Sequence, residues 1–513
     1  MASSDNKRIA KNTLFLYGRM LFLTVISLFT VRITLEAIGV EDYGIYNVVG
    51  SFVALFSVLT ATLTSATQRF LSFHLGKKDY EGYGKTFSLL LMGFAVISVV
   101  ILLIGEIAGI YAFDGFLKIP ADRLDAAKFV YQTCLVSFLF NMMAIPFTSS
   151  IISNERMSAF AYLSILDGVL KLGIVYLLLI FSGEKLKLYG ILQMGVCMLN
   201  FAFYSIYCHR KFKYCKIRFV WDKGLFKELT AYTGWNLLGA LSGVLATQGQ
   251  NVLLNIYFGP VINAAKAIGD RIQQVISSFS SNFYMAVTPQ IIKSYAANEL
   301  DRMRNLAIQS SKFSFYLLYI LSFPLICAMD QILEVWLGPD SKSPEMVGFA
   351  CLSLVFGLVN CLEQPITQMI RATGKIRNYQ ILAGSCTLMF IPIAWLTLKS
   401  GASPLSTMVV LIMIMALTMV IRLKVAKKQV GLSISSYLGK VVLPIIIVTI
   451  PSVLLYWGSI YIVVESLWTG LLIKASGAFV AGVLLVMVFG VTHSERSLIT
   501  TSIRNRLMRH KNH

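Results

Sequence analysis

The amino-acid sequence predicts an all-α integral membrane protein of about 14 transmembrane helices, arranged as two parallel-repeat six-helix bundles plus two C-terminal helices. Three observations support this fold class. Of the 513 residues, 56% are hydrophobic and 14% are charged, whereas soluble proteins carry about 25% charged residues. Long apolar runs recur along the whole chain, and one unusual pattern of polar residues within them appears twice.

The apolar runs are long enough to cross a bilayer, because a spanning helix needs about 20 predominantly apolar residues. Runs such as VVLIMIMALTMVI (409–421) do not alternate apolar and polar residues, as the strands of a membrane β-barrel do, so helices are favoured. The predicted spans are 12–36, 43–67, 87–111, 128–152, 158–181, 188–209, 231–257, 262–289, 308–329, 346–370, 379–398, 404–426, 438–463 and 468–491.

The repeated pattern is N-x4-P-x-T, followed by a cation and then an aromatic residue. It is formed by Asn141, Pro146, Thr148, Arg156 and Phe160, and again, 219 positions later, by Asn360, Pro365, Thr367, Lys375 and Tyr379. Gly39 and Gly259 also mark the first turn of their respective halves. A membrane chain built from two similar halves is typical of transporters, in which one half rocks against the other.

An even number of helices in each half means that both halves enter and leave the membrane on the same side, so the repeats are parallel. The predicted organisation is a cytoplasmic tail at 1–11, six-helix lobes at 12–209 and 231–426 joined by a basic cytoplasmic connector at 210–230, helices 13 and 14 at 438–491, and a basic cytoplasmic tail at 492–513.

The net charge of +20 comes from 45 Lys and Arg residues against 25 Asp and Glu residues. The cations concentrate in alternate connecting segments, above all 210–227, which the positive-inside rule places in the cytoplasm together with both termini. The basic surplus therefore reflects topology, with at most an attraction to anionic lipid headgroups, and no nucleic-acid partner is expected. The eight cysteines show no metal-binding spacing, so no metal site is expected.

Two blocks of the sequence resemble a known protein family. The first is KNTL (11–14) with IGVEDYGIY (38–46), and the second is VWLG (335–338) with Pro344 and ATGKIRNYQ (372–380). They are similar to bacterial polysaccharide-biosynthesis flippases, the O-antigen and exopolysaccharide translocases of the multidrug/oligosaccharidyl-lipid/polysaccharide exporter superfamily. The resemblance covers essentially the full length, but its motifs are structural turns, which identify the family better than the cargo.

The resemblance implies a flippase that carries undecaprenyl-diphosphate-linked oligosaccharide from the inner to the outer leaflet of the bacterial inner membrane, by alternating access through a cationic central cavity. It implies no cofactor and no catalytic residue. The expected ligands are the lipid-linked oligosaccharide and membrane lipids. The expected partners are the glycan polymerase and the glycosyltransferases of the same pathway, whose product is a surface polysaccharide such as the O-antigen of lipopolysaccharide or an exopolysaccharide.

The diphosphate and sugars of such a cargo must cross a medium that offers no hydrogen bonds, so a polar and preferably cationic path is needed. Ionisable side chains within the membrane cost about 2.5–3.5 kcal/mol each on insertion scales, which makes each of them a functional hypothesis. Asp167 with Lys171, and Lys266 with Asp270, are spaced i,i+4. Each pair is either a structural ion pair or part of a transport or ion-coupling site.

Three cations have no opposite charge at helical spacing. Arg271 lies about ten residues into its predicted span, near the midplane, and its planar fork suits a phosphate group, which makes it the principal candidate for substrate binding. Arg19 is the second candidate, with snorkelling to the inner headgroups as the alternative. Snorkelling is favoured for Lys474, which lies near an outer helix end.

Neutral polar and kinking residues complete the prediction. Gln248, Gln250, Asn251 and Gln274 of the seventh and eighth spans, together with Asn47 of the second, are expected to line the cavity and to hydrogen-bond sugar hydroxyls. Hydrogen bonds between helices are the alternative for these amides. Pro146 and Pro365 are predicted hinges, with fixed kinks as the alternative. Glu363 is a candidate for binding a coupling cation or proton, with a cytoplasmic interfacial position as the alternative.

Three other functions are alternatives to that of this flippase. An ion-coupled multidrug or cation antiporter on the same scaffold would need acidic residues on the N-terminal cavity face, whereas the deep unpaired charges here are cationic. A peptidoglycan lipid-precursor flippase is a near variant that charge alone does not separate. A membrane enzyme is not expected, because outer loops such as 112–127 are short and the sequence contains no P-loop or H-E-x-x-H motif.

Overall fold

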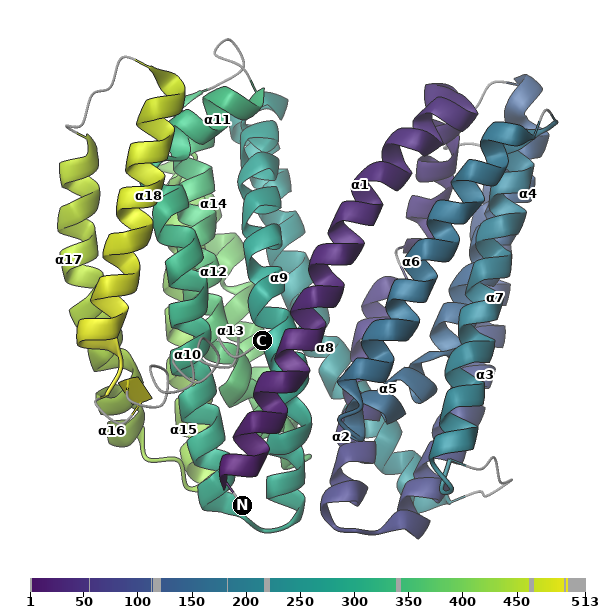
Figure 1. Cartoon of the computed structure of the whole chain (residues 1–513), viewed down its shortest axis with the longest axis horizontal. Coiled ribbons are helices and arrows are strands. Elements are labelled where there is room, and N and C mark those ends of the chain that lie inside the picture. The colour runs from purple at the N-terminus through teal and green to yellow at the C-terminus, as the bar shows by residue number, and fades with distance from the viewer. Residues whose placement is uncertain are drawn as a thin grey trace, which may run out of the picture. The chain divides into compact units, whose positions relative to one another are not determined.

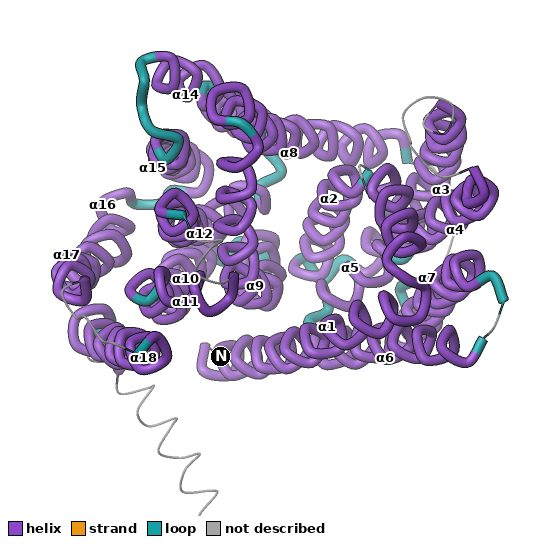
Figure 2. Tube along the Cα trace, turned by 90° about the horizontal axis from the view of Figure 1, so that it is seen from above, coloured by secondary structure: helices purple, strands orange, loops and turns teal. Residues whose placement is uncertain are grey.

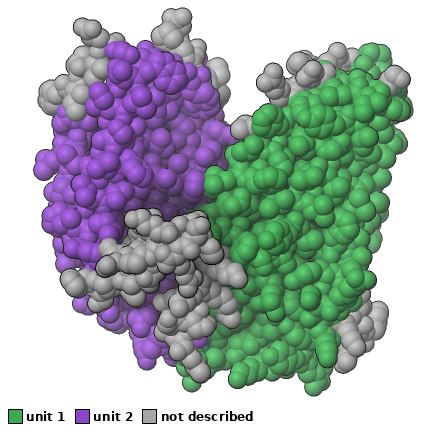
Figure 3. Space-filling view, in the orientation of Figure 1, with its two compact units in different colours: residues 1–241, 285–299 green, residues 242–284, 300–513 purple. Residues whose placement is uncertain are grey.

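The computed structural model describes residues 2–54, 56–111, 113, 121–181, 183–215, 222–337, 343–460, 466–492 and 495–496. These residues form helices joined by short turns, and no strand occurs among them (Figure 1, Figure 2). The chain divides into two compact units. Unit 1 comprises residues 1–241 and 285–299, and unit 2 comprises residues 242–284 and 300–513 (Figure 3).

Each unit is a helical bundle. Unit 1 contains α1 (Ala2–Ala54), α2 (Ser57–Gly76), α3 (Tyr80–Tyr111), α4 (Leu124–Met143), α5 (Ile145–Ser153), α6 (Met157–Ile180), α7 (Lys185–Lys211), the first part of α8 (Lys223–Phe258) and the last part of α9 (Pro260–Ala296). Unit 2 contains the other parts of α8 and α9, with α10 (Leu300–Cys327), α11 (Met329–Leu337), α12 (Pro344–Ala372), α13 (Arg377–Leu388), α14 (Phe390–Lys399), α15 (Ser406–Val430), α16 (Ile434–Tyr437), α17 (Leu443–Ile460) and α18 (Leu467–Leu485).

Eleven helical segments among the described residues are long and apolar enough to cross a membrane, and each coincides with a predicted span. The three other predicted spans also fall on helices, namely 12–36 on α1, 43–67 on α1 and α2, and 262–289 on α9. The α9 segment is less apolar because Lys266, Asp270 and Arg271 lie close together in it. The prediction of an all-helical, multi-pass membrane protein is thus confirmed.

The long helices carry apolar stripes that face out of the bundle. On α3, the side chains of Val96, Val99, Leu103, Ile107 and Ile110 are each more than half exposed and recur at the three- and four-residue spacing of one helix face. On the same helix Phe87, Phe94 and Ile101 are buried. Exposing such a stripe to water would be unfavourable, so this face is suited to the hydrocarbon of a bilayer.

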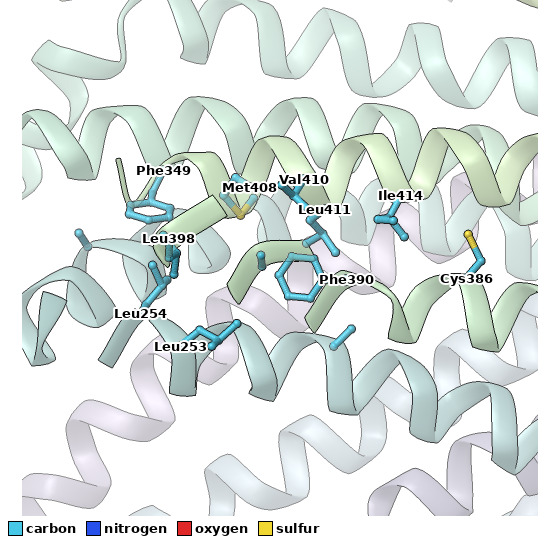
Figure 4. Packing of buried hydrophobic residues seen from close by; sticks show 13 residues of the cluster. Leu253, Leu254, Phe349, Cys386, Phe390, Leu398, Met408, Val410, Leu411 and Ile414 are labelled. Carbon is cyan, nitrogen blue, oxygen red and sulfur yellow. The ribbon is translucent and has the colours of Figure 1, made fainter. Parts of the chain in front are cut away.

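The hydrophobic core of unit 2 illustrates how the buried faces pack (Figure 4). Phe349 of α12 and Phe390 of α14 are fully buried and lie among Leu254 of α8 and Leu411 of α15. Aromatic and branched side chains from four helices therefore share one cluster, and van der Waals contact of this kind is the main force that holds helices together in lipid.

The turns that follow α2 and α9 have the same backbone geometry. Lys78 and Asn298 both adopt positive φ angles, 57° and 59°. The amide of Lys78 donates to the carbonyl oxygen of Leu75 over 3.1 Å, and the amide of Asn298 donates to that of Tyr295 over 3.0 Å. Residues with positive φ are uncommon outside glycine, so their coincidence 220 positions apart is structural evidence of a repeated turn.

Two more pairs of positions repeat in the same way. Gly39 and Gly259 have φ angles of 83° and 77°, and Glu155 and Gly374 have φ angles of 58° and 75°. Gly39 interrupts the α1 helix, where the backbone leaves helical geometry, and Gly259 separates α8 from α9. The spacing is 220 positions for the first pair. For the second it is 219 positions, which is the offset of the repeated sequence pattern.

We expect Gly259→Ala to lower the free energy of unfolding by about 1–2 kcal/mol, because a Cβ atom disfavours the left-handed conformation. Denaturant titration of the purified protein in detergent measures this change. Gly243→Ala is the matched control, because Gly243 lies inside α8 without a positive φ and a Cβ there meets nothing within 4 Å. The explanation from backbone strain is wrong if both substitutions have the same effect.

Candidate functional site

Arg19 lies in α1 of unit 1 and contacts the aromatic residue of the repeated pattern. Its guanidinium carbon is 4.7 Å from the centre of the Phe160 ring, a distance at which a cation is attracted to the ring face. The Nε atom of Arg19 is buried and makes no hydrogen bond to any described residue. Arg19 also interacts electrostatically with Tyr204 and Asp167, so its charge lies among helices of unit 1.

Asp167 and Lys171 form the ion pair that their spacing predicts. The Nζ atom of Lys171 is 2.9 Å from Oδ2 of Asp167, and the amide of Asn200 in α7 donates to Oδ1 of the same carboxylate. Both carboxylate oxygens are therefore occupied. The side chains are partly exposed, 40% for Lys171 and 26% for Asp167, so the pair is accessible from one side.

Arg271 is exposed and lies on α9, 11 residues after Pro260, which corresponds to about 16 Å along the helix axis. Its Nη1 atom donates a hydrogen bond to the side-chain oxygen of Gln274, one turn further on, over 3.1 Å. Among the described residues no carboxylate lies within ion-pair distance of its guanidinium. Arg271 and Gln274 thus present a cation and an amide together on one face of α9 in unit 2.

Lys266 and Asp270 also form their predicted pair on α9, with 2.5 Å between Nζ and Oδ2. The two ends of the pair differ in exposure. The Lys266 side chain is 4% exposed and that of Asp270 is 49% exposed, so the carboxylate faces outward while the ammonium group is enclosed. Asp270 therefore reduces the positive charge that Lys266 brings to this helix.

The predicted amides separate into two groups. Gln248 is exposed and accepts a hydrogen bond from Asn251 over 3.3 Å. Gln250 is 1% exposed, and its amide donates to Thr407 of α15 over 3.0 Å, which is the helix-to-helix hydrogen bond that the sequence left as an alternative. Asn47 lies in α1, and its side chain is outside the described residues.

The two prolines of the repeated pattern both lie within long helical segments. Pro146 follows Ala144, the residue at which α4 passes into α5, and Pro365 lies inside α12. The amides of Ala144 and Thr148 donate to the carbonyl oxygens of Phe140 and Ala144, so helical hydrogen bonds continue from α4 into α5. A proline in a helix interior removes one backbone donor and bends the helix, so both positions are compatible with a kink.

Glu363 belongs to a buried polar cluster whose other members lie on helices further along the chain. Its carboxylate, 2% exposed, forms an ion pair with Arg422 of α15. Arg422 also donates to the hydroxyl of Tyr379 in α13 over 3.0 Å and to that of Thr418 over 3.1 Å. The Thr418 hydroxyl donates in turn to Glu363 over 3.0 Å. The cluster ties α12, α13 and α15 together.

The aromatic residue of the pattern therefore meets an arginine in each half. Phe160 contacts Arg19 of α1, and Tyr379 contacts Arg422 of α15. Arg422 lies near the end of the predicted span 404–426 and was not among the predicted site residues. Tyr379 stands where the first copy of the pattern has Phe160, and a buried hydroxyl needs a hydrogen-bond partner. This difference was the sequence signal for a polar partner such as Arg422.

A further buried carboxylate, Glu155, was not among the predicted site residues. Glu155, in the turn between α5 and α6, has a side chain only 2% exposed and accepts from the Nζ atom of Lys293 over 2.6 Å. The amide of Gln290 donates to its other oxygen. Both partners lie in the last part of α9, which packs in unit 1. A Cβ at Gly76 of α2 would lie 2.7 Å from that of Ala296, so α2 and α9 approach closely beside this cluster.

Comparison with known proteins defines the class of protein. One similar solved structure is the "Outward-facing conformation of a multidrug resistance MATE family transporter of the MOP superfamily", with a TM-score of 0.70 and 13% identity over 83% of this chain and 96% of that chain. A second is a MOP superfamily transporter from Pyrococcus furiosus, with a TM-score of 0.70 and 12% identity over 83% of this chain and 96% of that chain. A third is a MATE structure in complex with MaD3S, with a TM-score of 0.67 and 16% identity over 83% of this chain and 96% of that chain. At these identities the likeness establishes the fold, which is that of a MATE-type transporter.

The family follows from the sequence. A family model described as "Polysaccharide biosynthesis protein" matches residues 9–294, more than half of the chain, and a model described as MatE matches residues 250–396. The comparison with curated proteins gave no match. The chain belongs to the polysaccharide biosynthesis protein family.

Proposed function

We propose that this protein is a flippase that moves undecaprenyl-diphosphate-linked oligosaccharide from the inner to the outer leaflet of a bacterial inner membrane. Alternating access through a cationic central cavity is the proposed mechanism, with both termini in the cytoplasm. A lipid-linked glycan is the kind of cargo that a polysaccharide biosynthesis transporter needs. The glycan polymerase and glycosyltransferases of the same pathway are the proposed partners.

The exposed guanidinium of Arg271 is the observation that supports this proposal. It lies deep along α9 and is unpaired with any carboxylate among the described residues, so its positive charge is available to an anionic ligand. A guanidinium binds phosphate oxygens through two parallel hydrogen bonds. Gln274 beside it supplies a further polar group. We propose Arg19, Lys266, Gln248, Asn251, Gln274 and Asn47 as the rest of the polar path. Gln250 is left out of it, because its buried amide donates to Thr407 of α15.

The alternative of a cation antiporter has less support. Such a transporter needs a carboxylate that is free to take up a proton or a metal cation. In the N-terminal half the candidate is Asp167, and both of its oxygens already accept bonds from Lys171 and Asn200. In the C-terminal half Glu363 is enclosed by Arg422 and Thr418. We propose that these carboxylates are structural in the resting state.

Six-helix lobes at 12–209 and 231–426, followed by helices 13 and 14, are the proposed arrangement of fourteen spans. The paired turns at Gly39 and Gly259, and at Lys78 and Asn298, support two copies of one helical plan. Pro146 and Pro365 remain candidate hinges within those copies. Rocking of one copy against the other would then open the path to each side in turn.

Deletion of the gene tests the function. We expect the deletion strain to lose its surface polysaccharide and to accumulate the undecaprenyl-diphosphate-linked oligosaccharide, identified by mass spectrometry of extracted lipids, with a plasmid-borne wild-type copy restoring both. Accumulation of a peptidoglycan precursor would favour the near variant of the flippase. Increased drug sensitivity without any accumulated lipid-linked sugar would instead favour the antiporter and contradict the proposal.

A further inference from the structure

A groove of about 350 Å³ lies between α10, α17 and α18 in unit 2. These three helices contact one another and lie side by side in Figure 1 and Figure 2. The walls of the groove include Leu454 of α17 and Ile473 of α18, whose side chains are 69% and 51% exposed. Exposed apolar side chains have a lower free energy in hydrocarbon than in water. The groove therefore faces the lipid that surrounds the protein.

Small residues create the hollow. Gly458 of α17 and Gly477 of α18 both line the groove, and a Cβ atom at either position would meet nothing within 4 Å. In membrane proteins such residues usually allow helices to approach closely. Here the glycines face open space instead of a neighbouring backbone. No side chain of the described residues fills this apolar hollow, and water would not occupy it favourably. A flexible hydrocarbon chain is therefore suited to it.

Lys474 adds a single positive charge to this otherwise apolar groove. It lies seven residues after the start of α18 at Leu467, about 10 Å along the axis. Among the described residues no carboxylate pairs with it. Ser459 of α17 and Cys327 of α10 are the other polar groups of the lining. A lysine at this depth can extend its ammonium group toward the headgroup level, where phosphate groups lie.

We propose that this groove binds one anionic phospholipid of the surrounding bilayer, with its phosphate at Lys474 and part of an acyl chain over Gly458 and Gly477. One ammonium group balances the single charge of a phosphodiester. A diphosphate would leave one negative charge uncompensated in an apolar site, which is unfavourable. The exposed walls give bilayer lipids lateral access, so the site does not depend on the cargo proposed above.

Native mass spectrometry of the full-length protein, with added phosphatidylglycerol or phosphatidylcholine of the same acyl chains, tests the site. We expect wild-type protein to bind one phosphatidylglycerol more tightly than phosphatidylcholine. Lys474→Gln should weaken phosphatidylglycerol binding about tenfold, the loss expected from one charge-assisted hydrogen bond, whereas Lys474→Arg should preserve it. Gly477→Leu should also weaken binding, because its side chain fills the hollow.

Two matched variants control for charge and bulk. Lys399→Gln removes a lysine of unit 2 that lies over the Trp395 ring outside the groove, and Gly439→Leu adds bulk at another glycine with open space around it. Both should bind phosphatidylglycerol like the wild type, and the thermal unfolding midpoints should show that every variant is folded. Equal binding by Lys474→Gln or Gly477→Leu would overturn the proposal. So would displacement of phosphatidylglycerol by an equal amount of undecaprenyl diphosphate, which would assign the groove to the cargo.

Discussion

Replacing Arg271 by Glu is expected to abolish surface polysaccharide in a strain that depends on this protein, while the variant still reaches the membrane. The substitution reverses the charge at an exposed position that no described carboxylate neutralises, so a diphosphate would be repelled where it is now attracted. Arg271→Ala removes the attraction without reversal. It should lower transport about 10- to 100-fold, because hydrogen bonds to a charged group contribute about 1.5–3 kcal/mol.

Two further variants separate substrate binding from a local structural role. Arg271→Lys keeps the charge but loses the planar fork, so it should retain part of the activity. Gln274→Ala removes the hydrogen-bond partner of Arg271 but keeps the cation, and its effect should be small. Polysaccharide is measured on isolated cells, and protein level by immunoblot of membranes. Normal polysaccharide in Arg271→Glu would show that this arginine does not contact the cargo.

Arg422→Met is expected to cause the largest loss of stability among single substitutions in unit 2. It leaves the carboxylate of Glu363 buried without its counter-ion, and breaking a buried ion pair by removing one partner costs about 3–5 kcal/mol. Replacing both residues by apolar ones of similar size should cost much less, because no charge then remains buried. Denaturant titration in detergent gives the free energy of unfolding for each variant.

The pair formed by Asp301 and Arg304 at the start of α10 is the matched control. Its Nη1 and Oδ1 atoms are 3.3 Å apart, but the Asp301 side chain is 94% exposed, and exposed pairs contribute about 0–1 kcal/mol. Asp301→Ala should therefore be nearly neutral. A double variant at 363 and 422 that is as unstable as Arg422→Met would mean that packing, and not the buried charge, determines the loss.

The sequence predicted the helices well because membrane spans are defined by local composition. The stripe on α3 from Val96 to Ile110 and the run at 409–421 need no tertiary information to be recognised as helical and apolar. The i,i+4 pairs of Asp167 with Lys171 and of Lys266 with Asp270 were found for the same reason. One helix already contains both partners, so helical geometry alone brings them together.

Contacts between helices far apart in the chain could not be predicted in this way. Glu363 and Arg422 are separated by 59 positions, and Glu155 and Lys293 by 138. Hydropathy and spacing say nothing about which face of one helix meets another. Gln250 shows the same limit. Its amide is polar enough to line a cavity, but the packing of α8 against α15 gives it Thr407 as a partner instead.

The left-handed turn at Glu155 and Gly374 has a consequence for how the halves of such proteins are aligned. A glutamate in this conformation is strained by about 1–2 kcal/mol relative to glycine, and in this chain its carboxylate is anchored by Lys293 and Gln290. The two positions thus share a positive φ angle, although glycine, the residue best suited to it, is present only at 374. Matching torsion angles, position by position, should reveal ancient duplications in membrane proteins after amino-acid identity has faded.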